Sequence, residues 1–135
     1  MSRVQLFFNS GSALAGASAG YFFGPMSPLL KALVVLAIID YISGICASAY
    51  EGKLSSSVGF KGIIKKVLIF CIVAVAHSLD SIFGGEYVRD ATIFFYLSNE
   101  LFSIIENAGR TNIPIPEFIR KGFLVLKRKS GKDEE

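Results

Sequence analysis

The sequence has few of the residues that build metal sites and covalent cross-links. It contains no tryptophan, one histidine and two cysteines. Cys46 and Cys71 both lie inside apolar blocks and do not form a CxxC pair, so we interpret them as small packing residues. His77, as the single histidine, leaves too few ligands for a histidine–cysteine cluster. We therefore expect no metal and no cofactor.

The signatures of enzymes and of nucleic-acid binders are also missing. The chain has no HExxH, GxSxG, Walker or Rossmann motif. A serine acting with His77 as an intramembrane protease dyad is a weak alternative, because no serine stands in a recognisable nucleophile setting. The basic C-terminal part is short and lacks interleaved aromatic residues. We expect neither catalysis nor nucleic-acid binding.

Charge is absent from long stretches of the chain. Residues 4–30 carry no charged side chain, hydrophobic residues make up 52% of the sequence, and the mean hydropathy is +0.52. The apolar residues are gathered into nearly uncharged blocks, which is typical of membrane spans. This pattern predicts an all-α integral membrane protein with three or four transmembrane helices and a short amphipathic C-terminal helix.

The predicted boundaries follow the apolar blocks. Spans are expected at about 4–24, 32–50, 67–83 and 91–107, within a transmembrane domain 1–109, separated by a basic loop 51–66 and a linker 84–90. A cytoplasmic part, 110–135, would hold the amphipathic helix and a charged tail. The first block is rich in glycine and serine, so an alternative has it on the membrane surface and leaves three spans.

The distribution of lysine and arginine predicts the topology. With the 51–66 loop and the C-terminus inside, inner segments hold twelve of the fourteen basic residues, and the outer segments hold only Lys31 and Arg89. Four spans then place both termini in the cytoplasm, whereas three spans would place the N-terminus outside. The basic residues expected to contact lipid headgroups are Lys65, Lys66, Arg120, Lys121, Lys127 and Arg128.

Four acidic residues fall within the predicted spans: Asp40, Asp80, Glu100 and Glu106. A carboxylate facing lipid costs at least about 2.5–3.5 kcal/mol, so these side chains should face a helix interface or water. One hypothesis is that they line or gate an aqueous passage; the alternative is structural hydrogen bonding near span ends, chiefly for Asp80 and Glu106. His77 and Asp80, three residues apart, would more often be a hydrogen-bonded couple than a proton relay.

The fourth predicted span has one polar side. Asn99, Ser103 and Glu106 are spaced i, i+4, i+7, and Glu100, Ser103 and Asn107 are spaced i, i+3, i+7. This stripe indicates a pore-facing surface or, as an alternative, an ordinary hydrogen-bonded seam between helices.

Small residues recur every four positions in two segments. Gly16, Gly20 and Gly24 form one series, and Gly44 and Ser48 form another. This spacing lets helix backbones approach closely, so it predicts oligomerisation or, equally, tight packing within one chain.

Several short motifs occur together in a fixed order. They are Asp40-Tyr41-Ile42-Ser43-Gly44, Gly52-Lys53-Leu54-Ser55-Ser56, Gly59, Gly62, Lys65-Lys66, Asp80, Arg89, Tyr96, Asn99-Glu100, Ser103-Ile104, Glu106-Asn107, and Pro114 with Pro116 before a short basic helix. Over about residues 29–127 this series resembles the phage holins of the group that includes the clostridial toxin-secretion holins.

The resemblance implies a function in a bacterium. Such holins accumulate in the cytoplasmic membrane of an infected cell and assemble into lesions that let endolysin reach the cell wall; related members release large toxins. Its partners would be the lipid bilayer, further copies of the chain, and endolysin without necessary direct contact. The alternatives are a small ion or solute channel of fixed stoichiometry and a non-conducting membrane scaffold or antiholin.

Overall fold

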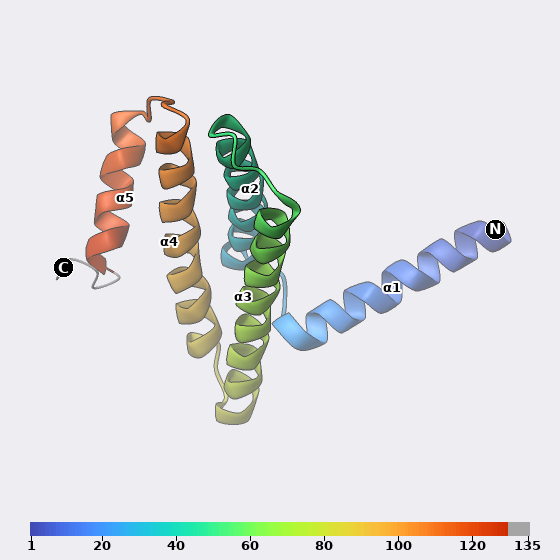
Figure 1. Ribbon diagram of the computed structural model, residues 1–135. Helices are drawn as coiled ribbons and strands as arrows, with labels where there is room; N and C mark the ends of the chain where they lie inside the picture. The colour runs from blue at the N-terminus through green and yellow to red at the C-terminus, as the bar shows by residue number, and fades with distance from the viewer. Residues whose placement is uncertain (130–135) are drawn as a thin grey trace.

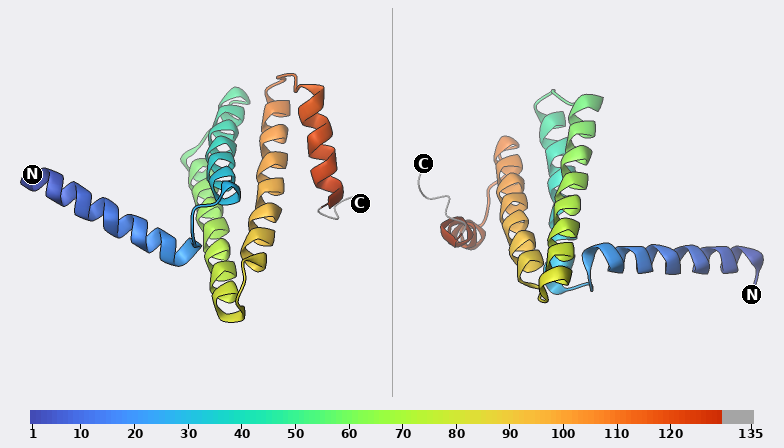
Figure 2. Two further views of the ribbon diagram at one scale, coloured as in Figure 1. Left: turned by 180° about the vertical axis from the view of Figure 1, so that it is seen from behind. Right: turned by 90° about the horizontal axis from the view of Figure 1, so that it is seen from below.

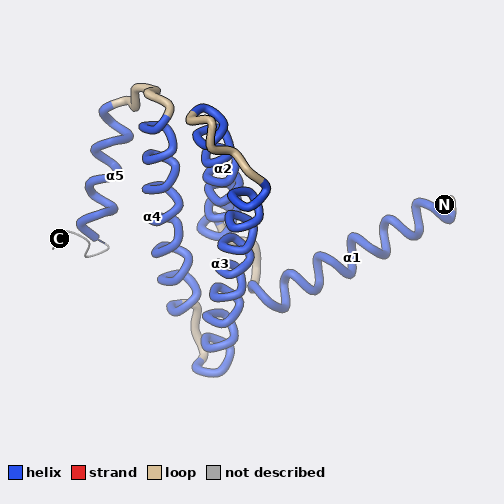
Figure 3. Tube along the Cα trace, in the orientation of Figure 1, coloured by secondary structure: helices blue, strands red, loops and turns tan. Residues whose placement is uncertain are grey.

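The computed structural model describes residues 1–129, apart from the side chains of Leu126 and Lys127. This part of the chain is all helical, as predicted, and contains no strand (Figure 3). The helices are α1 (Arg3–Phe23), α2 (Pro28–Tyr50), α3 (Ser56–Phe83), α4 (Tyr87–Arg110) and α5 (Glu117–Lys129).

Three helices form a bundle and the other two extend from it. α2, α3 and α4 lie side by side, α5 folds back along α4, and α1 projects away from the bundle (Figures 1 and 2). The buried apolar core lies between the three bundle helices and contains Leu30, Leu33, Val73 and Ile93. Phe102 and Phe123 hold α5 against α4, with ring centroids 4.2 Å apart.

Serine side chains start three of the helices. The hydroxyls of Ser2, Ser27 and Ser55 each accept a hydrogen bond from the backbone amide three residues later. The cap at Ser55 begins α3 at Ser56, so residues 56–66 are helical, whereas the sequence predicts a loop over residues 51–66. That prediction was wrong because it took polarity as a sign of a loop, although lysine is a good helix former.

The helices are long enough for a bilayer. At about 1.5 Å per residue, α2, α3 and α4 measure about 35, 42 and 36 Å, more than the ~30 Å of a hydrocarbon core. Among the described helices, α2 alone combines sufficient length with a sufficiently apolar composition to be a candidate span. The number of crossings therefore remains a prediction.

α1 does not pack as a fourth member of the bundle. None of its residues is buried, and only its C-terminal end meets the other helices (Figure 2). Large apolar side chains such as Phe7, Phe8 and Leu14 are more than two thirds exposed. α1 is thus an apolar arm with an unpartnered surface in the single chain.

Candidate polar centre of the bundle

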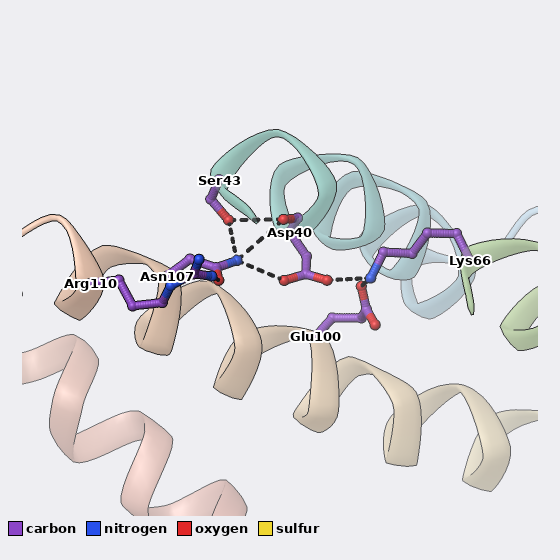
Figure 4. Close-up of polar contacts among 6 residues, drawn as sticks. All are labelled: Asp40, Ser43, Lys66, Glu100, Asn107 and Arg110. Carbon is purple, nitrogen blue, oxygen red and sulfur yellow. Dashed lines mark hydrogen bonds and ion pairs between the residues drawn. The ribbon is translucent and has the colours of Figure 1, made fainter. Parts of the chain in front are cut away.

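A lysine that forms two ion pairs lies between the three bundle helices. Lys66 of α3 pairs with Asp40 of α2 and with Glu100 of α4, so one ammonium group joins all three helices (Figure 4). The side chains of Lys66, Asp40 and Glu100 are only 18%, 10% and 5% exposed. Removal of such charges from water is costly unless they are paired, so each of them depends on the other two.

A side-chain amide from α4 donates further hydrogen bonds to Asp40. Asn107 Nδ2 donates to Asp40 Oδ1 at 3.1 Å, to the Asp40 carbonyl at 3.3 Å, and to Ser43 Oγ at 2.9 Å (Figure 4). Two carboxylates share one ammonium, so the neutral Asn107 amide supplies a further hydrogen bond to the carboxylate of Asp40. Asn107 is itself buried, which means that the contact is internal to the bundle.

The polar contacts continue to the end of the bundle through an arginine. Arg110 Nη1 donates to Asn107 Oδ1 at 3.2 Å and Nη2 to Ser48 Oγ at 3.3 Å. The same guanidinium binds Glu51 Oε1 at 2.5 Å. We call the connected set, Glu100, Lys66, Asp40, Ser43, Asn107, Arg110, Ser48 and Glu51, the polar network.

Two cavities flank the polar network. One of about 340 Å³ lies between α2, α3 and α4 near Tyr41, and one of about 310 Å³ lies near Tyr96. Lys66 and Ser103 line both cavities. At this level of the bundle α3 is held by the ion pairs of Lys66 and by the ring of Tyr41, which packs against Gly62 and Gly59. The cavities lie beside these contacts, so water can approach Lys66 and Ser103 from them.

A second polar cluster fixes the opposite end of the bundle. Asp80 accepts hydrogen bonds from the backbone amides of Val88 and Arg89 at 3.0 and 2.8 Å, and so caps α4 from α3. The Arg89 side chain, 2% exposed, donates from Nη1 to the carbonyls of Phe23 and Pro25, both at 3.0 Å. We call this cluster, Asp80 with Arg89, the terminal clamp, because it ties the end of α1 to α3 and α4.

The structure separates the four predicted intramembrane acids. Asp40 and Glu100 meet at Lys66, Asp80 belongs to the terminal clamp, and Glu106 is exposed. The polar stripe of α4 divides in the same way, since Glu100 and Asn107 are buried while Asn99 and Ser103 border the cavities. Among the described residues, no hydrogen bond joins Asp80 to His77; the Asp80 oxygens bind α4 amides instead.

The small residues predicted to drive oligomerisation fall into two groups, those packed within the chain and those with open surroundings. A Cβ added at Gly44 would lie 3.5 Å from Asn107 Nδ2, and Ser48 is buried against Arg110, so both pack within one chain. Around Gly16 and Gly20 nothing lies within 4 Å of an added Cβ. Gly24 is buried at the terminal clamp with φ of +77°, where an added Cβ would lie 2.6 Å from Arg89 Nη1.

The residues predicted to contact headgroups lie at several places. Lys65 is exposed on α3, and Arg120, Lys121 and Arg128 are exposed on α5. The side chain of Lys127 lies outside the described part of the structure. Lys66 points into the bundle toward two carboxylates, a partnership that sequence reasoning missed together with those of Arg89 and Arg110. Unpaired acids in apolar segments were the signal that basic partners were needed.

Comparisons with known proteins agree with the resemblance seen in the sequence. Residues 17–128 match the bacteriophage holin family. A probable holin of Bacillus phage phi105 is 33% identical over 120 residues, covering 85% of this chain and 88% of that protein. An uncharacterised protein of Listeria monocytogenes is 51% identical over 121 residues, covering 89% and 86% of the two chains.

A clostridial relative is also found. An uncharacterised 14.9 kDa protein of Clostridium perfringens is 30% identical over 131 residues, covering 96% of this chain and 99% of that protein. No solved structure matches the chain. The extent of the family match and the length shared with its relatives show that this chain belongs to the bacteriophage holin family.

Proposed function

We propose that this protein forms oligomeric lesions in the bacterial cytoplasmic membrane and thereby releases endolysin, or a toxin, without catalysis or a cofactor. Family membership and the similarity to a probable phage holin support this role. The proposal includes a multi-pass arrangement in which α2, α3 and α4 cross the bilayer. It places the α2–α3 connection and the C-terminal part in the cytoplasm.

The buried part of the polar network, enclosed by an apolar exterior, carries the proposal. Ile38 and Ile42 of α2 and Leu68 and Val75 of α3 are about half exposed or more, while Asp40 and Glu100 are buried. A soluble bundle would have the opposite distribution. A chain of this kind can reside in lipid with its charges satisfied internally.

The same arrangement supports a mechanism for opening. At low density each chain would keep its polar network closed around Lys66. Above a threshold density, contacts between chains through the small-residue face of α1 would nucleate a larger oligomer. The bundle would then open beside the two cavities, and the polar side of α4 would turn toward water. Hydration of Glu100 and its partners would offset the lost ion pairs, because burial of charges disfavours the closed form.

Endolysin release in growing cells tests the proposal. The protein is expressed together with a cytoplasmic endolysin that lacks an export signal, and culture density and entry of an impermeant dye are followed. We expect abrupt lysis only when both proteins are present, with endolysin alone as the control. Dye entry without endolysin release would instead identify a narrow channel. Neither effect, with the protein shown to be in the membrane, would identify a scaffold or antiholin.

A further inference from the structure

The 340 Å³ cavity beside the polar network has a basic lining. Lys61 and Lys65 of α3 and Arg110 of α4 all border it, together with Ser48 of α2. Its volume lies within the ~300–1,000 Å³ of typical small-ligand sites. Asp40 also borders the cavity, but its carboxylate is already bound by Lys66 and Asn107.

The two lysines bring uncompensated positive charge to this cavity. Lys61 and Lys65 are four residues apart on α3, so they share a face of the helix, and like charges at this spacing repel. Among the described residues neither lysine forms an ion pair. A bound anion would relieve the repulsion and would also reach the Arg110 guanidinium. The cavity is therefore suited to an anion with several oxygen acceptors.

The position of the cavity favours a lipid phosphate as that anion. It lies near the end of the bundle where α2 ends and α3 begins, which the basic-residue distribution places at the cytoplasmic face. Exposed apolar side chains continue along α3 from this point, including Ile64 and Leu68. Phosphate groups joined to acyl chains are available at such a boundary, and the cytoplasmic leaflet is rich in anionic lipid.

We propose that this cavity binds the phosphate of an anionic phospholipid from the cytoplasmic leaflet, with Lys61, Lys65 and Arg110 as the ligands and the acyl chains against α3. The inference rests on the proposed membrane arrangement. Arg110 also holds Asn107 and Glu51, so the headgroup contacts the polar network directly. Bound lipid would hold α3 and α4 together at this end and favour the closed bundle.

Lipid retention by the purified full-length chain tests this site. The protein in detergent is offered equal amounts of phosphatidylglycerol and phosphatidylcholine, and the retained lipid is counted by native mass spectrometry. The cavity variant carries Lys61→Gln with Lys65→Gln. The matched control carries Arg3→Gln with Lys31→Gln, which removes the same charge from exposed positions elsewhere. Circular dichroism checks that both variants keep their helices.

We expect at least fivefold preference for phosphatidylglycerol in the natural chain and the control, and loss of this preference in the cavity variant. If both variants lose the preference equally, the preference depends on overall charge and the proposal is overturned. A cavity variant that keeps the preference would also overturn it. Displacement of the lipid by inorganic phosphate at equal concentration would assign the site to a soluble anion instead. The assay needs no lysis, so its outcome is separate from that of the endolysin experiment.

Discussion

At the scale of single residues, Lys66 decides whether two buried carboxylates can coexist. Its ammonium joins Asp40 and Glu100, while Asn107 donates to the carboxylate of Asp40 and not to that of Glu100. Loss of the lysine would leave two like charges facing each other with no cation between them. Loss of either acid would leave the lysine one carboxylate to pair with. Replacement of Lys66 should therefore destabilise the bundle more than replacement of Asp40 or Glu100.

Lys66→Gln is predicted to destabilise the closed bundle by about 3 kcal/mol. This value is the lower end of the range for breaking a buried pair, since the Lys66 side chain is 18% exposed. Thermal unfolding in detergent, followed by circular dichroism, measures it. Lys31→Gln, at an exposed position of α2, serves as the control. Equal melting temperatures for Lys66→Gln and the natural chain would show that the ion pairs do not stabilise the bundle.

Glu100→Gln is predicted to change the timing of lysis without abolishing expression. The glutamine keeps a hydrogen-bonding group near Lys66 but removes one charge from the polar network, so the balance between closed and open forms shifts. Onset of lysis is compared at equal membrane levels of the two proteins, verified by immunoblot. Unchanged onset would remove Glu100 from the mechanism.

Part of the polar network could be predicted from the sequence. It identified Asp40, Glu100 and Asn107 as polar residues in apolar segments, and the structure brings those three together. It did not find Lys66 as their partner, because the preceding run of polar and basic residues resembled a loop. The pairing depends on which turn of α3 faces α2 and α4, and helical spacing within α3 does not determine that.

At the scale of secondary structure, the terminal clamp sets the direction of α1. Arg89 donates to carbonyls on both sides of Gly24, and the positive φ of Gly24 turns the chain from α1 toward α2. Glycine tolerates this conformation and leaves room for the guanidinium. The orientation of the apolar arm thus depends on one glycine and one buried arginine.

Gly24→Ala is predicted to destabilise the protein by about 1–3 kcal/mol, from backbone strain combined with the 2.6 Å approach to Arg89 Nη1. The control is Gly11→Ala, because an added Cβ there meets nothing within 4 Å. Urea or thermal unfolding in detergent compares the two variants. A Gly24→Ala protein as stable as the control would show that the clamp does not fix this turn.

Most helices were foreseen because apolar blocks and their interruptions mark them well. The start of α3 was missed, since the Ser55 cap was overlooked among several serines. The outward direction of α1 had no sequence signal: it follows from hydrogen bonds between Arg89 and carbonyls more than sixty residues earlier. Contacts at such separation depend on the assembled bundle.

At the scale of the whole molecule, the single chain leaves apolar surface unpartnered. α1 buries none of its residues, and α2 and α3 expose large aliphatic side chains. Lipid can cover the bundle surface, while the open face of Gly16 and Gly20 suits close approach by another helix. Because lipid can cover the bundle while α1 offers a face suited to another helix, we predict that copies of the chain meet through α1.

Gly20→Leu is predicted to reduce assembly in the membrane at least fivefold, because the larger side chain prevents close helix approach. Chemical cross-linking in isolated membranes measures the fraction of chains in oligomers. Ser18→Leu adds a similar side chain on the opposite side of α1 and should leave assembly unchanged. Equal cross-linking of both variants would exclude this face from the oligomer.

Release of contents from sealed vesicles by the purified protein tests the proposed formation of large lesions. Vesicles are loaded with both a small dye and a folded protein of endolysin size, and the protein-to-lipid ratio is raised stepwise. We expect folded cargo to escape abruptly above a threshold ratio, together with the dye. Release of dye alone at every ratio, or retention of both by vesicles shown to contain the inserted protein, would contradict it.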